Sequence, residues 1–169
     1  MAAGTSPSLS GTIASEKAVV EVPAIELLQS LGWQHADLLL EEPGPQNPTG
    51  RLSRREVVLP ARLRAALRRL NPSLPEDALQ QAEAKLTEDR SAMLPAAANR
   101  EVYRLLRDGV PVELRQPDGS VKPDRVRLVD WTNPQANDFF LASQPWFESE
   151  LYKRRPDAVG FVNGIPLLL

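Results

Sequence analysis

The segment best suited to carry a chemical function is Arg154-Arg155-Pro156-Asp157, which directly precedes the apolar stretch 158–169. It places a single carboxylate at the mouth of an apolar hairpin. A carboxylate is costly to bury unless it binds a cation or accepts hydrogen bonds, and Mg²⁺ takes carboxylate oxygens as ligands. Asp157 is therefore a candidate metal ligand. Two alternatives remain open: a polar turn residue before a strand, or an ion-pair partner of Arg154 or Arg155.

Other candidate residues are few. The chain has no cysteine and one histidine, His35, which excludes disulfide scaffolds, cysteine-based zinc sites and thiol nucleophiles. A lone histidine without evident partners is more often structural than catalytic. Asp130 and Asp138 are expected near strand ends, where either could approach Asp157 across a sheet. No glycine-rich phosphate loop and no G-x-S-x-G motif is present.

Positive charge is concentrated in one segment although the whole chain has a net charge of −2. Between Arg51 and Leu70 seven arginines face one acid, Glu56. An arginine row on an amphipathic helix is either a phosphate-binding surface or a solvated face. We expect an exposed, positively charged surface here, with the inward face formed by Leu59, Leu63, Leu67 and Leu70. The candidate DNA contacts are Arg62, Arg64, Arg68 and Arg69.

The surrounding pattern predicts one domain, since the chain has 169 residues. Residues 1–19 are expected to form a flexible tail before a domain over 20–169. Apolar spacing predicts helices at about 20–31, 60–70, 75–88 and 96–106. A hairpin is predicted over 110–129, followed by strands at 139–142, 158–162 and 165–169, the last two joined by Asn163-Gly164. Together these elements predict an α/β (α+β layered) fold with a mixed β-sheet flanked by helices.

Two features of the sequence bear on the cellular location of the protein and on the extent of the chain. No stretch approaches the roughly 20 apolar residues that cross a bilayer, and the first residues lack the pattern of a signal peptide, so we expect no membrane contact and a cytoplasmic location. The apolar run 165–169 is typical of a buried central strand. We therefore expect the chain to be a fragment, truncated at a C-terminal core strand.

Several ordered blocks resemble the amino-terminal region of the restriction (R, motor) subunit of type I restriction-modification enzymes. The resemblance covers about residues 20–169. Its blocks are 57–59 with 62–67, 70–75, 99–110, Val129-Asp130-Trp131 with Asn133-Pro134, Asn137-Asp138-Phe139 with Gln144, and 155–167.

This resemblance implies an endonuclease with a PD-(D/E)xK core that cleaves double-stranded DNA with Mg²⁺. Pro156-Asp157 matches the first motif, which assigns Asp157 as catalytic metal ligand and places Arg154 and Arg155 beside backbone phosphates. Glu21 or Glu26, on the first helix, would be an accessory carboxylate. The family's E-x-K, on the next strand, has no counterpart in residues 158–169. We therefore expect an incomplete metal site and an inactive isolated chain.

The resemblance further implies ATP-driven translocase domains outside this chain, and methyltransferase and specificity subunits as partners. The alternative is a non-catalytic DNA- or subunit-docking module that uses the arginine-rich helix. The catalytic interpretation predicts Asp157 at the start of a central strand, facing a cleft, with the first helix packed on the same sheet. A buried pair of Asp157 with Arg154 or Arg155 would contradict that interpretation.

Overall fold

The computed structural model describes residues 21–47, 49–149 and 152–169. The expected tail 1–19 lies outside these residues. The helices are α2 Val22–Ser30, α3 Pro60–Leu70, α4 Glu76–Leu86 and α5 Pro95–Asp108, with a short 3₁₀ turn at Pro134–Ala136. The strands are β1 Gln34–Asp37, β2 Val110–Arg115, β3 Val121–Val126, β4 Phe139–Ser143, β5 Phe147–Glu148, β6 Lys153–Arg154, β7 Ala158–Val162 and β8 Ile165–Leu168.

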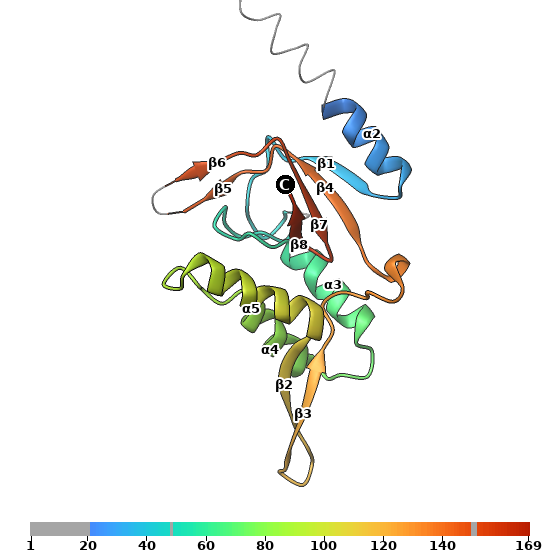
Figure 1. The fold of residues 1–169 in the computed structure, drawn as a ribbon, viewed down its shortest axis with the longest axis vertical. Coiled ribbons are helices and arrows are strands. Elements are labelled where there is room, and N and C mark those ends of the chain that lie inside the picture. Colours follow the sequence, from blue (N-terminus) through green and yellow to red (C-terminus); the bar gives the residue numbers. More distant parts are fainter. Residues whose placement is uncertain (1–20, 48, 150–151) are drawn as a thin grey trace, which may run out of the picture.

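A four-stranded sheet organises the part of the chain that carries the candidate site (Figure 1). Its strand order is β1-β4-β7-β8, with β1 parallel to β4 and the other pairs antiparallel. Two further ribbons stand apart from this sheet, β2 with β3 and β5 with β6. The predicted mixed sheet with flanking helices is therefore confirmed.

The two faces of the sheet are covered differently. Side chains alternate along a strand, so Phe140 and Ala142 of β4 enter one core while Leu141 and Ser143 face the side of α2. The first core also contains Leu38, Leu59, Val159 and Phe161. Figure 1 shows α3, α4 and α5 grouped below the sheet, whereas α2 lies apart from them and next to β1.

The larger core joins these three helices to the β2–β3 ribbon. Helix α3 is amphipathic, and its Leu63 and Leu67, four residues apart, are almost completely buried. They pack with apolar residues of α4, α5 and the ribbon, namely Ala78, Leu79, Ala82, Leu86, Leu105, Val110, Val112 and Val126. The observed α3 bounds agree with the predicted helix at 60–70.

The turn between β7 and β8 connects the sheet to α3. Asn163 and Gly164 have φ angles of 53° and 78°, as a tight hairpin turn of this type requires. The buried Asn163 side chain donates to the Leu128 carbonyl and accepts from the Asp138 amide. Gly164 accepts a hydrogen bond from the Leu59 amide at the start of α3. The predicted Asn-Gly hairpin is thus confirmed and also orders the neighbouring loops.

Changing Gly164 to Ala is expected to destabilise the protein by at least about 2 kcal/mol. A positive φ costs a non-glycine residue roughly 1 kcal/mol, and a Cβ here would lie 2.6 Å from the Leu59 carbonyl oxygen and 2.7 Å from the Leu63 amide nitrogen. Such overpacking costs about 1–3 kcal/mol. Chemical denaturation measures the difference. Gly119→Ala is the matched control, because its φ is 83° and its Cβ would meet open space; equal losses in the two variants would disprove the close approach.

Several predicted elements need correction. The return strand of the first ribbon is Val121–Val126 instead of 126–129, because Leu128 and Val129 leave the ribbon to enter the core. The strand β8 lies at the edge of the sheet, not at its centre, and Leu167, Leu168 and Leu169 are exposed. The short strands β1, β5 and β6 were not predicted. Among the described helices none is long and apolar enough to cross a membrane.

Candidate active site

Asp157 directly precedes β7, an internal strand of the sheet between β4 and β8. Its carbonyl oxygen accepts a hydrogen bond of 2.9 Å from the Gln144 amide, which extends the β4–β7 ladder by one step. Its side chain lines a cleft of about 350 Å³ between the sheet and α2. The predicted position at the start of a central strand is confirmed, and Asp157 is among the residues that line a concavity.

The cleft contains few polar side chains. Glu21, immediately before α2, and Ser143, the last residue of β4, line it together with Asp157. Its remaining walls are mostly apolar and come from α2, β4, β7 and β8, through Ala24, Ile25, Leu28, Leu141, Ala158, Gly160, Leu168 and Leu169. Glu26, the other predicted accessory acid, is exposed on α2 and is not among the residues that line this cleft. The structure therefore brings Glu21, and not Glu26, to Asp157.

Helix α2 forms one wall of this cleft at the edge of the fold. Its Leu28 and Ile25 are half-buried against the cleft, whereas Leu27 is 61% exposed. The apolar side of α2 and the residue after it, with Leu27 and Leu31, is therefore only partly covered in the described structure. Gly32, with a φ of 91°, follows the helix as predicted and turns the chain into β1.

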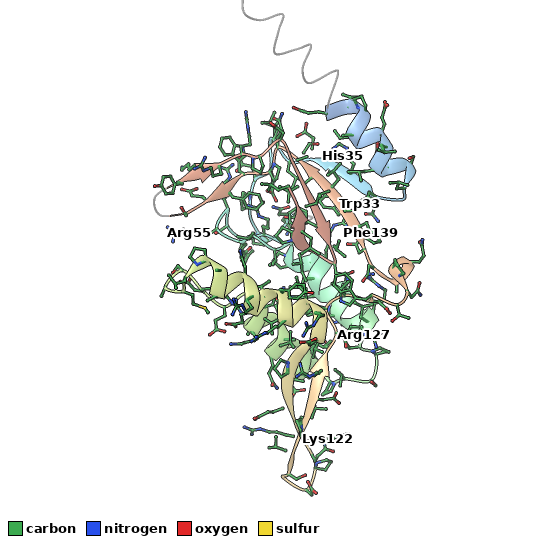
Figure 2. The ribbon with its side chains drawn as sticks, viewed as in Figure 1. Trp33, His35, Arg55, Lys122, Arg127 and Phe139 are labelled. Atoms are coloured by element: carbon green, nitrogen blue, oxygen red, sulfur yellow. The ribbon has the colours of Figure 1, made fainter. Side chains whose placement is uncertain are left out.

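His35 is coupled to the cleft through Ser143. The residue lies on β1 (Figure 2), whose parallel register places Asp37 opposite Ser143. His35 Nε2 and Ser143 Oγ are 2.8 Å apart, at hydrogen-bond distance. Sequence reasoning missed Ser143 altogether, because nothing local distinguishes it from any other strand-terminal serine.

The donor set fits a hard divalent cation in part. Mg²⁺ is commonly held by one or two carboxylates and otherwise by water, and the cleft supplies the carboxylates of Asp157 and Glu21 and the hydroxyl of Ser143. Within the described ranges there is no group of three or more His, Asp or Glu side chains arranged to hold a metal ion. The residues present would therefore hold Mg²⁺ weakly.

Arg154 and Arg155 lie beside Asp157 without pairing with it. Both are exposed, and their guanidinium groups lie over aromatic rings, 5.7 Å from the Tyr152 centroid and 5.1 Å from the Trp146 centroid respectively. No ion pair joins either arginine to a carboxylate of the described residues. The alternative of Asp157 as a buried partner of these arginines is therefore not what the structure shows.

The predicted exposed surface over 51–69 is wrong at its first member. Arg51 is completely buried, and its Nη1 donates to Glu41 Oε2 at 2.9 Å. Glu41 also accepts from Thr49 Oγ1 and Asn47 Nδ2, and Arg51 Nη2 donates to the carbonyl of Trp146. Burial lowers the pKa of Arg51, an effect that the charge of Glu41 opposes. This network fixes the loop before α3 to the strand connection that leads toward Asp157.

The arginines of α3 are mostly neutralised by neighbouring groups. Arg62 pairs with Asp138 at 2.8 Å, and its side chain is only 23% exposed. Arg64 and Arg68 pair with Glu83 and Glu76 of α4, while Arg69 donates to the Ala136 carbonyl and to Asn163 Oδ1. The hydrogen bond from Arg68 holds the pKa of Glu76 below its usual range, and the bond to Glu83 raises the pKa of Arg64.

The expected inward face of α3 is nevertheless correct. Leu59, Leu63 and Leu67 are buried, and Leu70 is half-buried. The sequence pattern did not indicate which groups the opposite face of α3 contacts. There, acids distant in sequence pair with arginines of the helix. DNA contact by Arg62, Arg64, Arg68 and Arg69 stays a prediction, and their ion pairs count against it.

Comparison with known proteins identifies the family of this chain. A profile described as "Type I restriction enzyme R protein N terminus" matches residues 13–169. The chain belongs to this family. The R-protein match spans the whole site described above, from Glu21 to Asp157 and through β8.

Two relatives of this R-protein N terminus carry names of the same kind. The type I restriction enzyme HindI endonuclease subunit of Haemophilus influenzae is 38% identical over 157 residues, covering 89% of this chain and 14% of that protein. A protein of Methanocaldococcus jannaschii, named as a candidate type I restriction enzyme MjaIXP endonuclease subunit, is 32% identical over 162 residues, 92% of this chain and 15% of that protein. The chain thus spans about one-seventh of the length of these relatives.

Proposed function

We propose that this R-protein N terminus is the nuclease region of a type I restriction enzyme, with a PD-(D/E)xK core that cleaves double-stranded DNA with Mg²⁺. The observation that carries the proposal is Pro156-Asp157 at the entrance to the internal strand β7, with the Asp157 carboxylate in a cleft that also receives Glu21. The names of the two relatives, both endonuclease subunits, support it.

In this proposal Asp157 and Glu21 hold the cation, and Ser143, paired with His35, contributes a fixed hydroxyl beside them. When bound, Mg²⁺ neutralises charge on the scissile phosphate and makes a bound water more acidic. Apolar residues of α2 and β8 line the cleft beside these groups. Arg154 and Arg155 face the phosphates that flank the scissile bond.

The rest of the reaction requires groups beyond these residues. A second acid and a lysine, spaced E-x-K, would complete a site of this class, and residues 158–169 contain neither Glu nor Lys. We propose that ATP-driven translocation resides in other domains of a longer subunit. The proposed partners are duplex DNA and the methyltransferase and specificity subunits, and the proposed location is the cytoplasm.

This 169-residue chain alone is expected not to cut duplex DNA in Mg²⁺, whereas a chain extended through the next strand is expected to cut. Two carboxylates leave Mg²⁺ mostly hydrated, and without the lysine nothing positions the attacking water or balances the developing charge. Nicking and linearisation of supercoiled plasmid, with and without EDTA, measure both proteins. Robust Mg²⁺-dependent cutting by this chain alone would place the active site elsewhere. An extended chain with E-x-K that binds DNA but never cuts would favour the docking-module alternative.

A further inference from the structure

We infer that the β5–β6 ribbon with its preceding Trp146 is a phosphate-contacting ridge for duplex DNA, and that this ridge, not the arginine-rich helix α3, guides the duplex to Asp157. The inference rests on the proposed nuclease function and names the surface by which that site takes its substrate. The ridge consists of Trp146, Tyr152, Lys153, Arg154 and Arg155, with Arg54 beside it from the loop before α3.

The ridge concentrates guanidinium–aromatic contacts. In the described structure three of six such contacts involve Trp146 or Tyr152. A typical protein has roughly one energetically significant case per 70–80 residues, so this clustering exceeds the ordinary frequency. Arg54 and Arg155 share the Trp146 ring, at 5.8 and 5.1 Å from its centroid.

An aromatic partner leaves a guanidinium able to bind phosphate. Contact with a ring face restrains the side chain without using its N–H donors. A carboxylate partner, by contrast, occupies those donors in a bidentate pair and cancels the charge. Arg154 and Arg155 are in the first condition, whereas Arg64 and Arg68 are in the second, each pairing with an acid of α4. Arg154 and Arg155 are therefore restrained and exposed, and among the described residues no carboxylate pairs with either of them.

The ribbon places this positive charge close to Asp157. Strands β4 and β7 pair with Ser143 opposite Ala158, and the chain between them forms the β5–β6 ribbon, with Phe147 opposite Arg154. Figure 1 shows the ribbon projecting outward from that end of the sheet. Asp157 stands at the base of the projection, three residues after Arg154, which is at most about 10 Å along an extended chain. Duplex DNA lying on the ridge would therefore pass within reach of the Asp157 carboxylate.

Binding measured without cleavage tests the inference. Anisotropy of a labelled 25-base-pair duplex, titrated with this chain in EDTA over a salt series, compares Arg154→Gln/Arg155→Gln with the matched control Arg64→Gln/Arg68→Gln. Each lost phosphate contact lowers the salt slope by about 0.9. The ridge variant is therefore expected to lose a slope of about 1.8 and to bind at least about ten-fold more weakly at 50 mM salt. Its deficit should shrink about twelve-fold by 200 mM salt, while the control should stay within about two-fold of the parent.

A variant that removes the aromatic ring and keeps the charge separates the contribution of the ring to binding from the contribution of the charge. Tyr152→Leu is expected to weaken binding about two- to five-fold with an unchanged salt slope. Equal losses in the ridge and α3 variants, an unaltered slope in the ridge variant, or no duplex binding by the parent at 20 mM salt would each overturn the inference. Failure of the extended chain to cleave, together with ridge-dependent binding by this chain, would count against the nuclease proposal alone, because the binding assay contains no metal.

Discussion

In the complete R subunit, Asp157→Ala is expected to lower DNA cleavage by at least about 10³-fold while ATP hydrolysis stays within about two-fold of the parent. In the proposed site Asp157 would provide a carboxylate ligand, and Glu21 is the one other acid among the described residues that line the cleft. Loss of a metal ligand removes several kcal/mol of transition-state stabilisation, and about 4 kcal/mol corresponds to 10³-fold in rate. ATP hydrolysis is spared because we place it in other domains.

Plasmid cleavage and phosphate release by the reconstituted enzyme measure the two activities side by side. Asp124→Ala is the matched control, since Asp124 lies on the β2–β3 ribbon at the far end of the molecule from β5–β6 (Figure 1). It should retain both activities. Glu21→Gln should reduce cleavage less than Asp157→Ala and should raise the Mg²⁺ concentration for half-maximal cleavage. Cleavage that survives Asp157→Ala would refute the assignment of this residue.

Arg51→Ala is expected to destabilise the isolated chain by about 3–5 kcal/mol, the usual loss when one member of a buried ion pair is removed. The substitution leaves Glu41 buried, with its side chain only 3% exposed and its strongest cationic partner gone. The Trp146 carbonyl and the face of the Phe147 ring lose the same guanidinium, whose Cζ lies 5.0 Å from the ring centroid. Urea denaturation followed by tryptophan fluorescence gives the free energy of unfolding.

Arg68→Ala provides the comparison, because the Arg68–Glu76 pair is largely exposed and should contribute little to stability. The double variant Arg51→Met/Glu41→Leu is expected to recover most of the lost stability, since apolar residues of similar volume often replace a buried pair without cost. A loss below about 1 kcal/mol for Arg51→Ala would show that water reaches Glu41. No recovery in the double variant would assign the loss to the Thr49 and Asn47 hydrogen bonds instead.

The sites of the Asp157 and Arg51 variants are connected through the loop that Arg51 anchors. Arg51 and Arg54 both leave this loop to meet the chain between β4 and β5, Arg51 at the Trp146 carbonyl and Arg54 over the Trp146 ring. The same connection leads through the ribbon to Asp157. Arg51 thus lies behind the proposed ridge without belonging to it, and Arg51→Ala is expected to weaken duplex binding only as far as it unfolds the chain.

Local patterns in the sequence determined much of this fold. The leucine spacing and the proline at its start placed α3 correctly, the Asn163-Gly164 pair located the β7–β8 turn, and Pro156-Asp157 marked the entrance to an internal strand. These features depend on contacts within a few residues, for example the helical repeat of α3 or the positive φ that a tight turn requires. The sequence alone can therefore specify them.

The tertiary structure decided which charges remain available. Arg51, Arg64 and Arg154 are the same residue type, yet one is buried on Glu41, one pairs across helices with Glu83, and one lies exposed on Tyr152. Glu21, immediately before α2, lines the Asp157 cleft, whereas Glu26, five residues later on α2, does not. In each case the partner is supplied by packing between distant segments. The free energy of a charge depends on its surroundings in space, which no local pattern of residues records.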